Sequence, residues 1–186
     1  MSVLEKELVV SDLNFDFNKK DAVTEFIKEF GQQFSISKSV REQHTDTTTI
    51  HTSKLPDGVV FAENEIDVKK TVEICQKYKC PIIPFGVGSS LEGHVNALYG
   101  GISIDLNNMN KILHVSPEDG YAVVQPGVTR EQLNVYLRDT GLFFPIDPGA
   151  NASLGGMAST NASGTNAVRY GCLLYTSPSP RDRTRS

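Results

Sequence analysis

The chain has 186 residues, a length that suits one domain, or one domain and part of a second. Hydrophobic residues make up 39% of the chain and charged residues 22%, which is typical of a globular protein and argues against disorder. The formal net charge is −4 with no basic stripe, so nucleic acid is not expected as a partner. No apolar run approaches the ~20 residues that a membrane-spanning helix requires, so no transmembrane segment is expected.

The amino-terminal residues predict no targeting segment. They mix acidic residues with lysines and lack arginine, unlike a signal peptide or a transit peptide. The chain's three cysteines form no Cys-x-x-Cys pair, which predicts reduced thiols, a cytoplasmic location and no metal site.

The first predicted helix is marked by apolar residues at spacings of three and four, namely Val23, Phe26, Ile27 and Phe30. Asn18 is expected to cap this helix and Gly31 to end it. The polar, Thr-rich residues 40–49 that follow predict an exposed connector. His44 and Asp46 within it are interpreted as surface residues without a catalytic role.

A strand–helix–strand unit comes next. Residues 58–62 and 82–85 predict two short strands, and a helical crossover between them favours a parallel pair. Asn64 is expected to cap the helix, with Asp67 at its third position. The predicted apolar face of this helix consists of Ile66, Val68, Val72, Cys75 and Tyr78.

Three further strands are predicted at residues 101–106, 112–115 and 121–125. The first alternates as a half-buried strand would. Because no helices separate these strands, antiparallel additions and an α+β layering are expected. His114, between apolar neighbours, is interpreted as structural.

A third helix is predicted to begin at a capping box, Thr129-Arg-Glu-Gln132. Its expected buried stripe consists of Leu133, Tyr136 and Leu137. Gly141 is expected to end it.

Residues 81–94 contain a glycine-rich strand exit. Gly86 and Gly88 allow positive φ and close approach of another molecule, and Ser89 and Ser90 add hydroxyl groups. A turn of this kind can present N–H groups to a phosphate or pyrophosphate. Leu91 stands where the dinucleotide fingerprint needs its third glycine, and no P-loop lysine follows. On these residues alone, a tight turn without a ligand remains an equal alternative.

A second segment, residues 149–167, consists almost entirely of small or polar residues. Such composition is found in flexible linkers, which is the alternative interpretation. Leu154 and Met157 interrupt the run, which argues against a linker. Because small side chains let a main chain lie flat against a planar ligand, the two segments together suggest one cofactor held between them.

Four motifs in order give a specific resemblance. They are Pro-Ile-Ile-Pro-Phe-Gly-x-Gly-x-x-Leu-Glu-Gly, Gln-Pro-Gly-Val-Thr-Arg, Phe-Pro-x-Asp-Pro-Gly-Ala-x-Ala-Ser-Leu-x-Gly-Met-Ala and Ala-Ser-Gly-Thr-Asn-Ala-Val-Arg-Tyr-Gly. From about residue 41 to residue 171 the chain resembles the FAD-binding part of the D-lactate dehydrogenase (cytochrome) and glycolate oxidase FAD subunit-like family. That family has a vanillyl-alcohol oxidase (PCMH) type FAD-binding domain.

The resemblance implies an α+β fold of which only the N-terminal part is present. It divides the chain into an N-terminal helical segment at 1–37, an incomplete FAD-binding domain at 38–171 and a tail at 172–186. The tail begins Cys-Leu-Leu-Tyr-Thr-Ser-Pro-Ser-Pro-Arg-Asp, which is the translation of a common transposase sequencing adapter. We therefore expect the tail to be non-native and leave it out of the fold.

The function implied by the resemblance is oxidation of a D-2-hydroxy acid such as D-lactate to the 2-oxo acid. FAD takes the hydride, and an external acceptor such as a cytochrome or quinone receives the electrons. The implied location is cytoplasmic, peripheral to the inner membrane, or mitochondrial in a eukaryote. A non-catalytic nucleotide- or flavin-binding module is the alternative.

The resemblance also implies the residues that bind the cofactor. It places the pyrophosphate on Gly86, Gly88, Ser89, Ser90 and Leu91. It places the rest of the flavin on Pro148, Gly149, Ser153, Gly155, Gly156, Asn161 and Gly164. No catalytic residue or metal ligand is assigned, because in the family these lie beyond Gly171, and the chain alone is expected to be inactive.

Overall fold

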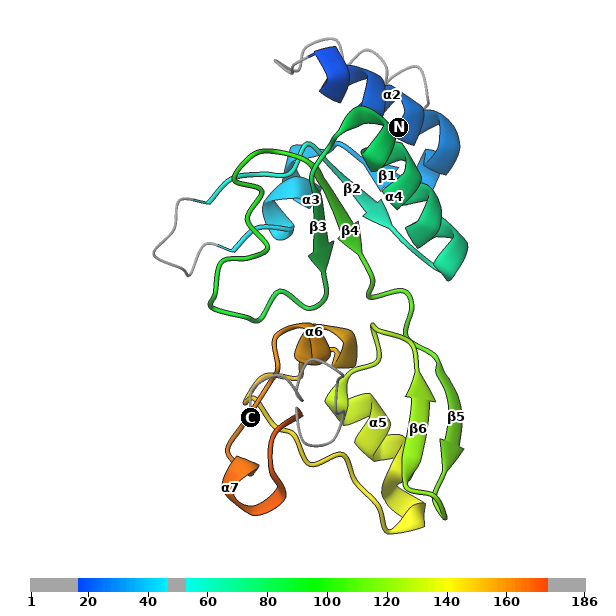
Figure 1. Cartoon of the computed structure of the whole chain (residues 1–186), viewed down its shortest axis with the longest axis vertical. Coiled ribbons are helices and arrows are strands. Elements are labelled where there is room, and N and C mark those ends of the chain that lie inside the picture. The colour runs from blue at the N-terminus through cyan, green and yellow to red at the C-terminus, as the bar shows by residue number, and fades with distance from the viewer. Residues whose placement is uncertain (1–16, 47–52, 174–186) are drawn as a thin grey trace, which may run out of the picture. The chain divides into compact units, whose positions relative to one another are not determined.

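The computed structural model describes residues 17–46 and 53–173, which belong to two compact units, residues 1–108 and 109–186 (Figure 1). Each unit has its own β-sheet and its own clusters of buried apolar side chains. The elements of the first unit are α2 (Phe17–Phe30), a 3-10 helix (Gly31–Gln33), β1 (Phe34–Ser35), α3 (Lys38–Gln43), β2 (Gly58–Phe61), α4 (Glu65–Tyr78), β3 (Ile82–Phe85) and β4 (Ile102–Asp105).

The sheet of the first unit has the strand order β1-β2-β4-β3. β2 and β3 are both parallel to β4, and β1 is antiparallel to β2. The predicted strands at 58–62 and 82–85 are confirmed, but their direct pairing is wrong because β4 lies between them. The strand predicted at 101–106 is confirmed as β4, but its predicted antiparallel pairing and half-buried character are wrong. β4 is parallel and all four of its residues are buried, since a central strand is covered on both faces.

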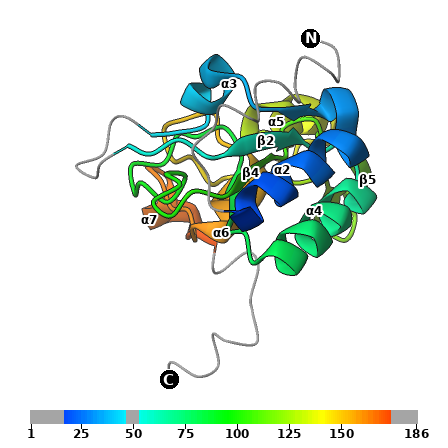
Figure 2. The same ribbon diagram turned by 90° about the horizontal axis from the view of Figure 1, so that it is seen from above.

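Helices α2 and α4 pack together against one face of this sheet (Figures 1 and 2). Their shared core contains the four predicted apolar residues of α2 together with Phe34, Val60, Ile74, Cys75 and Ile102. At the solvent edge of the helix pair, Lys77 and Tyr78 hydrogen-bond to Glu25 and lower its pKa. The helix pair thus covers one face of the sheet.

Three expectations for the amino-terminal part are corrected. Asn18 lies inside α2 rather than before it, so it is not the cap. The connector predicted at 40–49 is helical to Gln43, and His44 and Asp46 are buried with exposures of 4% and 5%. Residues 47–49 lie outside the described residues. The polar sequence predicted exposure wrongly, because His44 and Asp46 form buried hydrogen bonds with residues far away in sequence.

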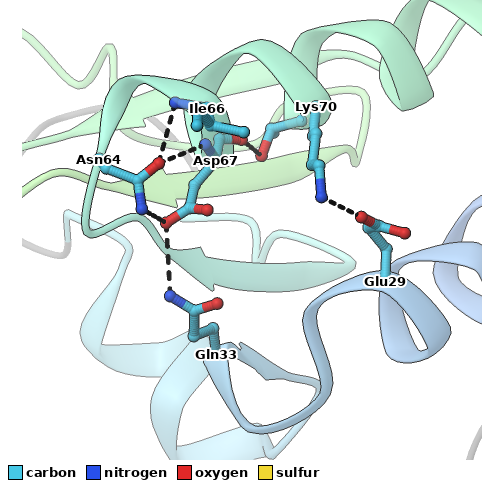
Figure 3. A network of polar contacts seen from close by, with 7 residues as sticks. Glu29, Gln33, Asn64, Ile66, Asp67 and Lys70 are labelled. Atoms are coloured by element: carbon cyan, nitrogen blue, oxygen red, sulfur yellow. Dashed lines mark hydrogen bonds and ion pairs between the residues drawn. The ribbon is translucent and has the colours of Figure 1, made fainter.

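Helix α4 begins as predicted. The Asn64 side chain accepts hydrogen bonds from the amides of Ile66 (2.9 Å) and Asp67 (3.1 Å), so it caps the helix (Figure 3). The Asp67 carboxylate in turn accepts from Asn64 Nδ2 and from Gln33 Nε2, which ties the cap to the 3-10 helix. Lys70 forms an ion pair with Glu29 of α2.

The predicted apolar face of α4 is only partly correct. Ile66 is 65% exposed and Val72 45% exposed, whereas Thr71, Ile74 and Cys75 are buried. The Thr71 hydroxyl donates to Asp67 O at 2.8 Å, which satisfies it within the helix and lets this polar residue face the core.

We expect Asn64→Ala to destabilise the protein by about 1 kcal/mol, because two amides of the first turn of α4 lose their acceptor. Urea unfolding followed by circular dichroism measures this loss. Gln76→Ala on the exposed side of the same helix is the matched control and should change stability by less than about 0.5 kcal/mol. Equal effects of the two variants would contradict the capping role.

The second unit contains β5 (Ile112–Ser116), β6 (Tyr121–Val124), α5 (Arg130–Leu137), a 3-10 helix (Arg138–Thr140), α6 (Leu154–Ser159) and α7 (Ala167–Tyr170). β5 and β6 pair antiparallel, as predicted. Leu133 and Leu137 of α5 are buried with Val128 and pack against apolar side chains of this hairpin. The third predicted helix continues from α5 through the 3-10 helix and ends at Gly141, with φ +74°, as predicted.

The predicted capping box at residues 129–132 is half formed. Thr129 Oγ1 accepts from Gln132 N at 3.2 Å, but Gln132 Nε2 donates to Asn110 O instead of returning to the cap. Tyr136 is 59% exposed and does not belong to the buried stripe. His114 lies in β5 and is exposed, with its ring 5.6 Å from that of Tyr121, and its structural role stays a prediction.

The small-residue segment contains helix α6, and α7 begins at its last residue, which disfavours the linker alternative. Met157 of α6 is buried in a cluster with Ile146 and Leu173. Among residues 17–46 and 53–173, no helix has the length and apolar character needed to cross a bilayer.

Candidate functional site

The glycine loop, residues 86–91, leaves the sheet at the carboxyl end of β3. Gly88 has φ +66°, as expected, whereas Gly86 does not adopt positive φ, so that part of the expectation is wrong. Gly88 and Ser89 are exposed, and Leu91 is 73% exposed. The loop therefore offers its main chain to solvent at the sheet edge where ligands of parallel sheets bind.

The amides of the glycine loop are available to a ligand. None of the backbone N–H groups from residue 87 to residue 91 donates to another described residue. Ser90 Oγ accepts a hydrogen bond of 3.4 Å from Glu92 N, which leaves its own proton free to donate. A row of such donors around a left-handed glycine fits the negatively charged oxygens of a phosphate group.

Packing also requires a glycine at position 88. A Cβ there would lie 2.8 Å from Cζ and 3.0 Å from Cε2 of Phe85. Positive φ and this contact both exclude a larger side chain. At Gly88 the exposed loop therefore packs directly against the buried ring of Phe85.

Beneath the loop lies a buried polar group that the sequence interpretation missed. Phe61, Asp105 and Phe85 pair in register across β2, β4 and β3, so their side chains share one face at the carboxyl ends of the strands. His44, immediately after α3, covers all three. Its ring centroid lies 5.7 Å from that of Phe61 and 4.4 Å from that of Phe85, and its Nε2 lies 3.0 Å from Asp105 Oδ2.

The hydrogen bonds of His44 define where its protons lie. Nδ1 is 2.7 Å from Val40 O, and because a carbonyl can only accept, Nδ1 carries a proton. Nε2 and Asp105 Oδ2 then share a second proton, either as imidazolium and carboxylate or as two neutral groups. Both arrangements give the buried pair no net charge, which makes its burial tolerable.

The only sequence signal for this group was Asp105, a charged residue closing the apolar strand Ile-Ser-Ile-Asp. His44 gave no signal, because its neighbours are polar and its partner is 61 positions away.

The thiols expected to be reduced are free in the structure. A hydrogen bond to Cys80, together with burial, raises the pKa of Cys75, so this thiol stays protonated and unreactive. Among the described residues, no group of three or more His, Cys, Asp or Glu side chains is placed to hold a metal ion.

In the second unit, the predicted residues lie on two loops and the start of α6. Pro148 and Gly149 are exposed, and the amide of Gly149, with φ +89°, donates to Asp147 Oδ1. Gly164 contacts the main chain of Asp147 so closely that a Cβ would lie 1.7 Å from Asp147 O. Thr165 N also donates to this carbonyl at 3.2 Å, which holds the two loops together.

The remaining predicted residues differ in accessibility. Ser153 is 1% exposed, and a Cβ on Gly155 would lie 2.6 Å from Cβ of Pro126, so packing accounts for both. Gly156 and Asn161 are exposed, and Asn161 adopts φ +50°. Contact of these four residues with a cofactor stays a prediction.

Comparison with known proteins identifies the relatives. Residues 56–175 match the family model of the FAD binding domain. The chain is 52% identical to a probable mitochondrial D-lactate dehydrogenase of Danio rerio over 75% of its own length and 28% of the relative's. It is 46% identical to a mitochondrial D-lactate dehydrogenase [cytochrome] of Arabidopsis thaliana, over 64% of this chain and 21% of that one. The chain thus spans about a quarter of these relatives.

The fold is similar to that of a solved enzyme structure. Alkyldihydroxyacetonephosphate synthase superposes with a TM-score of 0.75 and 26% identity, over 85% of this chain and 32% of that one. The predicted α+β fold, the N-terminal part of a vanillyl-alcohol oxidase type domain, is confirmed.

Proposed function

Because the chain belongs to the FAD-binding domain family, we propose that it forms the first part of an FAD-dependent D-2-hydroxy-acid dehydrogenase whose glycine loop binds the pyrophosphate of FAD. The observation that carries the proposal is the exposed row of amides without described partners, at residues 87–91, beside the carboxyl end of β3. Phosphate oxygens would accept from these amides and from the Ser89 and Ser90 hydroxyls.

The residues of the second unit are proposed to hold the rest of the flavin. Pro148 and Gly149 present exposed main chain, as do Gly156 and Asn161 of the small-residue segment. Their short side chains allow close approach of a planar ring. Ser153, Gly155 and Gly164 support this surface by fixing α6 and the neighbouring loops.

Bound FAD would supply a hydride acceptor at a site that the protein shapes, and the substrate would leave as a 2-oxo acid. The described residues contribute binding and orientation of the cofactor. The similarity to D-lactate dehydrogenases supports D-lactate or a related 2-hydroxy acid as substrate, a cytochrome as electron acceptor and, in a eukaryote, a mitochondrial location.

The proposal keeps the predicted division of the chain at residues 37 and 171. The family match from residue 56 supports the FAD-binding assignment of the middle segment, and it runs into the first residues of the proposed tail. Leu173, in that tail, packs against Ile146 and Met157, as an apolar side chain of any origin would. Genomic DNA of the source that encodes residues 175–182 in frame would contradict an adapter origin.

The decisive experiment is to express the full-length reading frame that contains this chain and to record its absorption spectrum. We expect bound FAD, and we expect D-lactate to bleach the flavin band under anaerobic conditions while L-lactate leaves it unchanged. A colourless protein that takes up no added FAD would contradict the proposal. Bound FAD that no 2-hydroxy acid reduces would favour a non-catalytic flavin-binding module.

A further inference from the structure

We propose that His44 and Asp105 are positioning residues that set the conformation of the glycine loop for its diphosphate ligand. This inference rests on the proposed function, and it assigns a role to two buried residues that do not themselves reach the ligand loop. They act through two contacts, one polar and one aromatic, which both end on residues 86–88.

The polar route runs through Asn107. Asp105 uses Oδ2 for His44 and Oδ1 to accept from the amide of Asn107 at 2.8 Å. The Asn107 side chain then donates from Nδ2 to Gly86 O at 2.8 Å. The first carbonyl of the glycine loop is thus fixed by a side chain whose own backbone is held by the buried carboxylate.

The aromatic route runs through Phe85. The His44 ring lies 4.4 Å from the Phe85 ring, and the Phe85 ring reaches the position that a Cβ on Gly88 would occupy. The imidazole therefore limits where the Phe85 ring can move. The ring in turn lies against the one residue of the loop that has positive φ.

These two routes matter because the loop has little else to hold it. Its amides from residue 87 to residue 91 make no hydrogen bond with another described residue, and its side chains are small or exposed. A loop that must present several donors to one ligand binds more tightly when its conformation is already fixed. Burial of the His44–Asp105 pair makes its geometry rigid, with exposures of 4% and 7%.

The test measures the Kd of FAD for the apo form of the full-length protein, alongside the thermal midpoint of that apo form. We expect His44→Ala and Asn107→Ala each to raise the Kd about tenfold, since each removes a hydrogen-bonded support of the loop. Asp105→Ala should do the same, whereas Asp105→Asn should retain most of the affinity. An amide oxygen at position 105 can still accept from Asn107 N, and its NH₂ can donate to a neutral His44 Nε2.

Thr71→Val is the matched control, because Thr71 is fully buried in the same unit and its hydroxyl bonds only within α4. It should lower the thermal midpoint without changing the Kd more than about twofold. Variants at His44, Asp105 and Asn107 that lower the midpoint but leave the Kd within twofold of wild type would overturn the positioning role. Asn107→Ala decides the matter if the two buried variants fail to fold. Wild-type protein without affinity for FAD would instead overturn the proposed function itself.

Discussion

Gly88→Val is expected to raise the Kd of FAD by roughly 30-fold, which corresponds to about 2 kcal/mol, while the secondary structure of the full-length protein stays intact. A β-branched residue is strongly disfavoured at φ +66°, and its Cβ would meet the Phe85 ring at 2.8 Å. The loop must therefore leave the conformation that presents its amides. The ratio of flavin to protein absorbance after gel filtration, followed by titration of the apo form, measures the loss.

Gly120→Val controls for backbone strain alone. Gly120 has φ +68°, almost the same as Gly88, but a Cβ there would meet no atom within 4 Å. It lies in the turn between β5 and β6, away from every predicted cofactor-binding residue in sequence. We expect this variant to lose stability and to keep its flavin. If both variants retained FAD equally, the assignment of the glycine loop to the pyrophosphate would be wrong.

Much of the local structure of this chain could be predicted from short-range patterns. Asn64 caps α4 and Thr129 caps α5, because the cap is decided by a side chain and an amide two or three residues apart. The strands at 58–61 and 82–85 were likewise evident from short apolar runs. FAD was predicted from the family resemblance, which depends on four motifs in order and not on any single pattern.

Long-range pairing could not be predicted from the same patterns. The sequence of β4 does not show that this strand lies between β2 and β3 and is parallel to both. That arrangement requires residues 86–101 to return the chain to the amino end of the sheet. The polar segment around His44 likewise gives no sign that this histidine is buried against an aspartate 61 positions later. Both errors have one cause, since burial depends on partners that a local window does not contain.

The glycines of the small-residue segment show why composition alone predicted the site incompletely. Gly149 is exposed and left-handed, which suits approach by a ligand. Gly155 and Gly164 are glycine because protein backbone or proline occupies the space of their side chains. The same residue type therefore serves ligand access at one position and packing at the other two, and only the structure separates these roles.

Gly164→Ala is therefore expected to destabilise the second unit locally, by about 3 kcal/mol. The added Cβ would lie 1.7 Å from Asp147 O and 2.2 Å from Asp147 C, and no side-chain rotation can relieve an overlap with main chain. The loop containing Pro148 and Gly149 must then separate from residues 164–165, which breaks the hydrogen bond from Thr165 N to Asp147 O. Hydrogen–deuterium exchange of peptides covering residues 145–170 measures this local opening.

Gly141→Ala provides the comparison within the same unit. Gly141 is also left-handed, at φ +74°, but a Cβ there would meet nothing within 4 Å, so only the backbone strain of about 1 kcal/mol is expected. Faster exchange at Thr165 together with weaker FAD binding in Gly164→Ala, and neither change in Gly141→Ala, would tie cofactor affinity to the joined loops. Unchanged exchange in Gly164→Ala would mean that the two loops are not packed as described, and the support proposed for Pro148 and Gly149 would fail with them.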